Sequence, residues 1–113
     1  MWLLTTRGFY SVVANRHDPE LVLVRTRVRD DLEGLRDLVP ELEIEHTPRA
    51  DYEWRAAVRR PAWTAVVCSL AAGIDYGNFK DAVAHAQGLD RASLYAIVWA
   101  TLRDLQSPPR HQV

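Results

Sequence analysis

The sequence has little of several features that define common protein classes. Its one cysteine, Cys68, excludes an internal disulfide. No apolar run approaches the roughly 20 residues that a membrane-spanning helix needs. The first apolar run stops at Thr5, which is too early for a signal peptide. We therefore expect a cytoplasmic protein without a membrane contact.

An excess of either charge is also missing. The chain has 14 basic and 15 acidic residues and a formal net charge of -1, which argues against binding of polyanions by bulk charge. The basic residues are unevenly chosen, because Lys80 is the single lysine and all others are arginines. A chain of 113 residues that is 48% hydrophobic is long enough for one hydrophobic core. We predict one α+β domain over residues 1–106 and a flexible tail over 107–113.

Alternating apolar residues predict strands in the first half of the chain. The segments are residues 9–13, 21–29, 42–45 and 52–59. Turn-forming residues at 15–19 separate the first two segments, so these two should form a hairpin.

Helical spacing predicts helices over residues 31–39, 61–74, 79–87 and 91–105. Side chains suited to N-terminal caps are those of Asp30, Asp31, Asn78 and Asp90, and Gly88 suits a C-terminal stop. Cys68 falls beside the apolar stripe of the second helix, where we expect it to be a packing residue rather than a nucleophile. The core stripe expected for the last helix consists of Leu94, Ile97, Val98, Thr101, Leu102 and Leu105.

The order strand, strand, helix thus occurs twice. Two such units predict an antiparallel-rich sheet of four strands with helices on one face, followed by a helical C-terminal third. A circularly permuted ferredoxin-like fold would have this arrangement.

Arginines alternate with apolar residues on two of the predicted strands. Arg25, Arg27 and Arg29 share one face of the second strand, and Arg55 and Arg59 share a face of the fourth. Two interpretations remain open, because like charges on neighbouring strands repel each other unless something acidic intervenes. The face is either solvated and neutralised by cross-strand salt bridges, or it contacts a partner. The glutamates available for such bridges are Glu41, Glu43, Glu45 and Glu53.

Two further groups of residues are candidates for function. Tyr95 and Trp99 lie one turn apart off the main stripe of the last helix, where they either cover the core or anchor a partner. The polar cluster consists of Asp75, Asn78, Lys80, Asp81 and His85. Within this cluster a carboxylate could orient the imidazole one turn away, although turn, cap and solvated residues have the same composition. The sequence contains no local metal-site spacing, no nucleophilic triad and no phosphate loop, so we predict no cofactor and no metal.

Residues 7–13 partly match the aromatic signature of RNA-recognition motifs. The arginine, the glycine, the first aromatic residue and a valine match, but Tyr10 and Ser11 reverse the expected small and aromatic positions. Membership is therefore rejected, and only the idea that the sheet face stacks bases is retained.

The segments 1–3, 8–13 and 74–80 resemble those of a family of small uncharacterised bacterial proteins. The resemblance rests on the stretch Gly8-Phe9-Tyr10-Ser11-Val12-Val13 and on Ile74-Asp75-Tyr76-Gly77-Asn78-Phe79-Lys80. It implies a bacterial, cytoplasmic protein and supplies no activity.

The leading hypothesis from the sequence is a non-enzymatic protein-interaction or regulatory module that forms a homodimer or binds another protein. The alternative is a nucleic-acid-binding protein that uses the arginine-lined sheet face. A second alternative is a small enzyme centred on residues 75–85.

Overall fold

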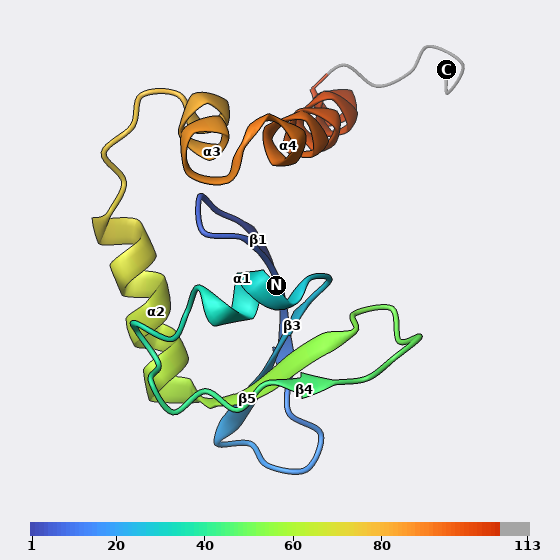
Figure 1. Ribbon diagram of the computed structural model, residues 1–113, viewed down its shortest axis with the longest axis vertical. Helices are drawn as coiled ribbons and strands as arrows, with labels where there is room; N and C mark the ends of the chain where they lie inside the picture. The colour runs from blue at the N-terminus through green and yellow to red at the C-terminus, as the bar shows by residue number, and fades with distance from the viewer. Residues whose placement is uncertain (107–113) are drawn as a thin grey trace. The chain divides into compact units, whose positions relative to one another are not determined.

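The computed structural model describes residues 1–106, which form two compact units (Figure 1). The first unit is Met1–Asp75, and the second begins at Tyr76. The elements of the first unit are β1 (Trp2–Leu4), β2 (Phe9–Ala14), β3 (Leu21–Thr26), α1 (Arg29–Glu33), β4 (Glu45–His46), β5 (Trp54–Arg59) and α2 (Arg60–Ala72). Those of the second unit are α3 (Phe79–Gln87), α4 (Leu89–Leu102) and the short 3-10 helix η1 (Arg103–Leu105).

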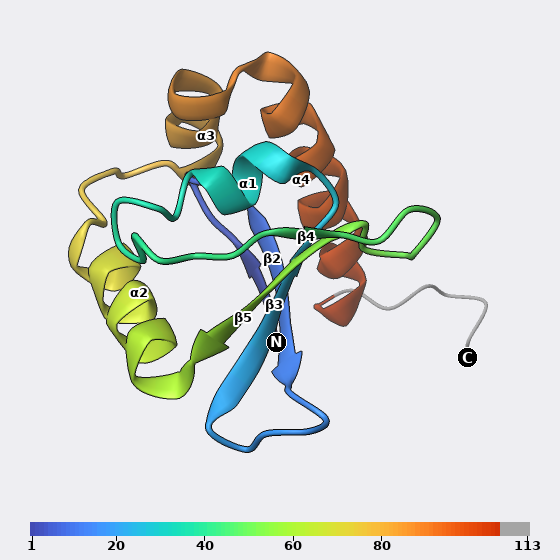
Figure 2. The ribbon, with the colours of Figure 1, turned by 60° about the horizontal axis from the view of Figure 1, so that its bottom comes forward.

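The strands of the first unit form one antiparallel sheet in the order β1-β2-β3-β5-β4. Figure 2 shows β2, β3 and β5 side by side, so β3 and β5, which carry Arg25 and Arg55, are neighbours within the sheet. The sheet has five strands instead of the predicted four. The additional strand, β1, has three residues, which is too short to show an alternating pattern in the sequence.

The hydrophobic core of the first unit lies between one face of the sheet and the helices α1 and α2. Alternate strand residues face it, because successive side chains of a strand point to opposite faces. Helical spacing in α2 directs Trp63 and Val66 to the same side. The fully or nearly buried strand residues of this core are Tyr10, Val12, Val22, Val24, Ala56 and Val58. The α+β class and the placement of helices α1 and α2 on one face are confirmed.

Both ends of α1 differ from the prediction over residues 31–39, because the helix ends at Glu33 and Gly34 is its C-cap. The helix begins at Arg29, and neither Asp30 nor Asp31 caps it. Asp31 is instead buried, and its carboxylate accepts a hydrogen bond of 3.0 Å from the Phe9 backbone N–H. Gly8 makes this contact possible, since a Cβ there would lie 2.5 Å from the Asp31 Cγ.

Three predicted strands are shorter than the sequence pattern suggested, and the one predicted over 52–59 begins at Trp54. The alternation over residues 21–29 ends at Thr26, which is fully buried and donates its hydroxyl hydrogen to the Val28 carbonyl over 2.7 Å. Arg27 and Arg29 therefore lie beyond β3. The segment 42–45 forms a strand only from Glu45, and Leu42 packs into the core of the unit from the loop before it.

The second unit consists of the two packed helices α3 and α4. Asn78 caps α3 as predicted, since its side-chain oxygen accepts a 2.9 Å hydrogen bond from the Asp81 backbone N–H. Gly88 separates the helices with a φ of 96°, a backbone conformation that residues other than glycine rarely adopt. The predicted cap at Asp90 is wrong, because α4 begins at Leu89, two residues earlier than predicted, and Asp90 lies inside the helix.

Cys68 is exposed, so the packing role predicted for it is wrong: it lies on the outer side of α2. Within residues 1–106, no helix has the length and apolar character needed to cross a membrane. The predicted tail, residues 107–113, lies outside the described residues. The single domain and the ferredoxin-like arrangement stay predictions.

Candidate interaction surfaces

One row of side chains crosses the whole sheet on the face opposite the core. The register pairs Glu45 with Arg55, Arg55 with Arg25, Arg25 with Ser11, and Ser11 with Trp2. Directly paired residues of antiparallel strands point to the same face. The five side chains therefore line one path from the edge strand β4 to the edge strand β1, and we call them the open-face row.

Arg25 is fixed in the middle of the open-face row. One terminal nitrogen, Nη2, donates a 2.7 Å hydrogen bond to the Ser11 hydroxyl oxygen. Its guanidinium carbon lies 4.7 Å from the centre of the Tyr52 ring, within cation–π range. Tyr52 precedes β5 and is buried outside the hydrophobic core, near Phe9 of the open face at a ring separation of 6.4 Å.

Arg55 lies beside Arg25 on the neighbouring strand. Its Nη2 donates a 3.1 Å hydrogen bond to the Tyr52 carbonyl oxygen. The Nε atoms of both arginines are buried and have no hydrogen-bond partner. Over residues 1–106 neither arginine forms an ion pair. The centre of the sheet thus holds two adjacent positive charges that form no ion pair within residues 1–106, and the carboxylate next to them in the row is that of Glu45.

The other three arginines of the predicted surface are placed differently. Arg27 pairs with Asp51 at 3.0 Å, and its guanidinium carbon lies 4.4 Å from the Tyr52 ring centre. Arg29 pairs with Glu33 at 3.1 Å. Arg59 is exposed at the far end of β5, opposite Leu21. The predicted surface therefore divides into a central pair, two neutralised arginines and one separate arginine.

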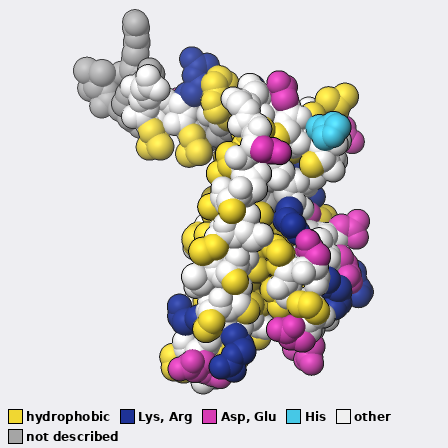
Figure 3. Space-filling view, turned by 90° about the vertical axis from the view of Figure 1, so that its left-hand side faces the viewer, with side chains coloured by type: hydrophobic (Ala, Val, Ile, Leu, Met, Phe, Trp, Pro, Cys, Tyr) yellow, Lys and Arg dark blue, Asp and Glu magenta, His cyan; other side chains and the backbone are white. Residues whose placement is uncertain are grey.

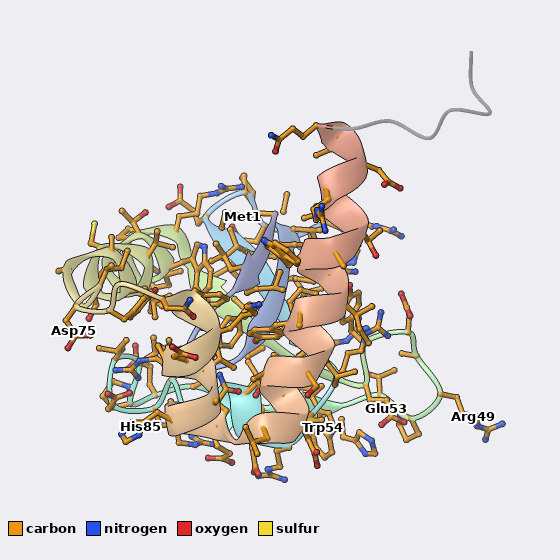
Figure 4. The ribbon with its side chains drawn as sticks, turned by 90° about the horizontal axis from the view of Figure 1, so that it is seen from above. Met1, Arg49, Glu53, Trp54, Asp75 and His85 are labelled. Atoms are coloured by element: carbon orange, nitrogen blue, oxygen red, sulfur yellow. The ribbon has the colours of Figure 1, made fainter. Side chains whose placement is uncertain are left out.

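The glutamates expected to neutralise the sheet arginines do not do so. In the described part of the chain, ion pairs to these arginines come from Asp51 and Glu33. Figure 4 shows Arg49, Glu53 and Trp54 on the hairpin that joins β4 and β5, with Arg49 at its tip. The glutamates without an ion pair are Glu41, Glu43, Glu45 and Glu53.

The second candidate surface is the apolar side of α4. The stripe predicted to face the core is exposed, with Leu94 at 61% and Ile97 at 63%. Figure 3 shows hydrophobic side chains on the surface of the unit that contains α3 and α4, in the upper part of the view. We call this surface the α4 face. Its residues are Leu94, Ile97, Val98, Thr101, Leu102 and Leu105.

Packing within the helical unit explains why the α4 face is left uncovered. Tyr95 is only 6% exposed, and its ring stacks on that of Phe79 from α3 at 5.8 Å and 9°. Trp99 is 55% exposed and has Lys80 at 4.9 Å and Arg103 at 5.3 Å from its ring centre. The aromatic side of α4 thus meets α3, whereas the sequence pattern indicated that the aliphatic side would be buried.

The candidate polar cluster is not drawn together into one site. Asn78 is a cap, and Lys80 lies against Trp99. Asp81 and His85 are both exposed, and within residues 1–106 neither is bonded to the other. Figure 4 shows the side chains of Asp75 and His85 pointing outward from the loop after α2 and from α3. The hydrogen bond from a carboxylate to the imidazole, on which the enzyme hypothesis depends, is therefore not formed among the described residues of the cluster.

Ion pairs lower the pKa of two carboxyl groups, those of Asp37 and Glu33. Arg7 binds Asp37 through both of its terminal nitrogens, at 2.8 and 3.0 Å, which lowers the pKa of that carboxyl. Glu33 accepts hydrogen bonds from Arg36 and Arg29, in that order of effect, and its pKa is lowered as well.

The chain matches no family model, no curated protein and no solved structure. Over residues 1–106, no group of three histidine, cysteine, aspartate or glutamate side chains is arranged to hold a metal ion.

Proposed function

We propose that this protein acts by binding, as a protein-interaction module that forms a homodimer through the α4 face. The observation that carries the proposal is the exposure of this apolar surface along a 14-residue helix. It replaces the arginine face and the pair Tyr95 and Trp99 as the proposed dimer contact. Tyr95 supports the α4 face indirectly, because its ring packs on Phe79 and holds α4 against α3.

The composition of α4 supports the proposal that a partner covers the side of the helix that α3 leaves open. From Ala92 to Leu102 the helix has no charged residue. Helices that are apolar around their whole circumference are normally buried. Within the second unit, α3 covers the side that bears Tyr95 and leaves the α4 face open. Water contact along that face is costly, at about 25 cal/mol per Å² of apolar surface.

A second copy of the chain is the occupant that best fits this face. A surface without charge is complementary to another surface without charge, and the α4 face is itself such a surface. In a dimer with two-fold symmetry the same patch from each copy forms the interface, so self-complementarity is sufficient. Leucine, isoleucine and valine side chains from two such helices can interdigitate at the usual interaxial distance of about 8–10 Å.

Sedimentation velocity over a range of protein concentrations tests this proposal. The wild type should sediment as a dimer at micromolar concentration, and Val98→Asp should sediment as a monomer because it buries an unpaired charge. Ala100→Asp is the matched control. It adds the same charge to the same helix, at an exposed position about 160° around the axis from Val98.

Ala100→Asp should remain dimeric, and circular dichroism should show unchanged helix content in both variants. A wild type that is monomeric at all concentrations contradicts the proposal. Equal dissociation by both aspartates would contradict it too, since the effect would then not depend on the α4 face.

A further inference from the structure

We propose that Arg25 and Arg55 together bind one phosphate group at the centre of the open-face row. The site consists of residues of the first unit, whereas the α4 face belongs to the second, and the proposal does not depend on dimer formation. The ligand class is a phosphate group, either free or within a single-stranded nucleic acid. Trp2, at the end of the same row, would contact a base in the second case.

The first argument is the direct pairing of two like charges. Arg25 and Arg55 are cross-strand partners, whose Cβ atoms are separated by about 5 Å in such pairs. Like charges in this position destabilise a sheet unless an opposite charge intervenes. The described residues provide no carboxylate in ion-pair contact with either one. A bound dianion would remove the repulsion.

The second argument is the unused hydrogen-bonding capacity of the pair. Within residues 1–106 each guanidinium uses only its Nη2 group in a hydrogen bond, so the Nη1 group of each has no acceptor, and the buried Nε–H groups have none either. A guanidinium presents its donors as a planar fork that matches the oxygens of phosphate. One phosphate has enough oxygens to accept hydrogen bonds from both forks, and such charge-assisted hydrogen bonds are about twice as strong as neutral ones.

The third argument is that the two side chains are already held in place. The Ser11 hydroxyl and the Tyr52 ring fix Arg25, and the Tyr52 carbonyl fixes Arg55. Side chains that are ordered before binding lose less conformational entropy when a ligand arrives. Arg27 shares the Tyr52 ring but already has Asp51 as its partner, so it is not part of the site.

The ends of the open-face row differ in a way that orients the ligand. Glu45 lies next to Arg55 on the edge strand β4 and would repel an anion at that end. Trp2 lies at the other end, is 69% exposed, and meets Phe9 edge to face at 6.0 Å. Two strand spacings, about 10 Å, separate Trp2 from Arg25. An exposed indole beside a phosphate contact is the combination that binds single strands by stacking and charge.

The experiment uses two probes, inorganic phosphate followed by 31P NMR line broadening and a fluorescein-labelled oligo-uridine followed by anisotropy. The test variant is the double substitution Arg25→Gln with Arg55→Gln. The matched control is Arg16→Gln with Arg49→Gln, which removes the same charge from two exposed arginines outside the row. Thermal unfolding checks that each variant is folded.

Binding of either probe should fall by at least about tenfold in the test variant and by much less in the control. Arg25→Lys with Arg55→Lys retains the charge but loses the fork, and should also weaken binding. Trp2→Ala separates the sources: weaker oligo-uridine binding with unchanged phosphate binding identifies a nucleic acid, and no change in either identifies a free phosphate group.

Absence of binding of both probes to the wild type at low salt overturns the proposal. Equal losses in the test and control variants overturn it as well, because bulk charge would then explain the binding. The Val98→Asp variant should bind both probes like the wild type, so failure of the dimer leaves this test intact.

Discussion

The two units of this protein differ in where their apolar side chains lie. In the sheet unit most of them are buried between the sheet and the helices α1 and α2, and Leu32 and Val24 are completely inaccessible. In the helical unit, Val83 and Tyr95 are buried, while the aliphatic residues of α4 remain exposed. The apolar surface of the sheet unit therefore stabilises that unit, whereas the aliphatic surface of α4 remains exposed, and we propose that a second copy covers it.

Truncation of a buried side chain in the sheet unit should have the largest effect. Leu32→Ala should lower the free energy of unfolding by about 2–5 kcal/mol, because it leaves a cavity in the core. Leu94→Ala on the α4 face should cost far less at protein concentrations where the chain is monomeric. Urea denaturation of both variants measures the difference, and similar losses would contradict the contrast between the units.

Gly8→Ala tests how tightly the sheet unit is packed around Asp31. The new methyl group would lie 2.5 Å from the Asp31 Cγ, so the loop and the carboxylate must separate. We expect a loss of roughly 1–3 kcal/mol, comparable to other overpacking substitutions. Thermal unfolding measures the loss. If Gly8→Ala is as stable as the wild type, the packing of Asp31 against this loop is not as described.

Asn78→Ala tests the local stability of the helical unit. It removes the oxygen that accepts from the Asp81 backbone N–H, and loss of such a cap costs about 0.5–2 kcal/mol. Amide hydrogen exchange should become faster in α3, while the strands of the sheet unit keep their protection. Asn78→Asp retains an acceptor and should preserve most of the protection.

The smallest effect should come from acid. In the folded chain Arg7 lowers the pKa of Asp37, so the stability from this pair is fully present above the unfolded pKa of about 3.9. It is lost as the pH falls from that value through the lower folded pKa. Asp37→Asn should therefore reduce the loss of stability between about pH 4 and pH 2. An unchanged acid profile would show that the exposed pair contributes nothing.

Local patterns in the sequence predicted most of the sheet unit. Alternation placed Val22, Val24, Ala56 and Val58 on the core face, and helical spacing placed Trp63 with them. Alternation predicted that the second strand continues to Arg29, but β3 ends at Thr26. The hydroxyl of the buried Thr26 donates a hydrogen bond to the nearby Val28 carbonyl, a contact that alternation does not encode. The short strand β1 was missed for lack of length.

The prediction that the aliphatic stripe of α4 faces the core was wrong. Helical spacing identifies an apolar stripe but not what covers it, and in this protein the aromatic side, through Tyr95, packs on α3. The predicted arginine surface shows the same limit. Spacing grouped five arginines, and only the cross-strand register singles out Arg25 with Arg55. Both surfaces depend on contacts between distant segments.

Cysteine cross-linking tests the central claim, that a second copy covers the α4 face, most directly. In a Cys68→Ser background, Val98→Cys should form a disulfide-linked dimer under mild oxidation, because the two-fold partner presents the same position near the middle of the interface. Ala100→Cys on the opposite side of the helix should remain monomeric under identical conditions. Efficient cross-linking of Val98→Cys alone is the predicted result, and no cross-link, or equal cross-linking at both positions, would contradict it.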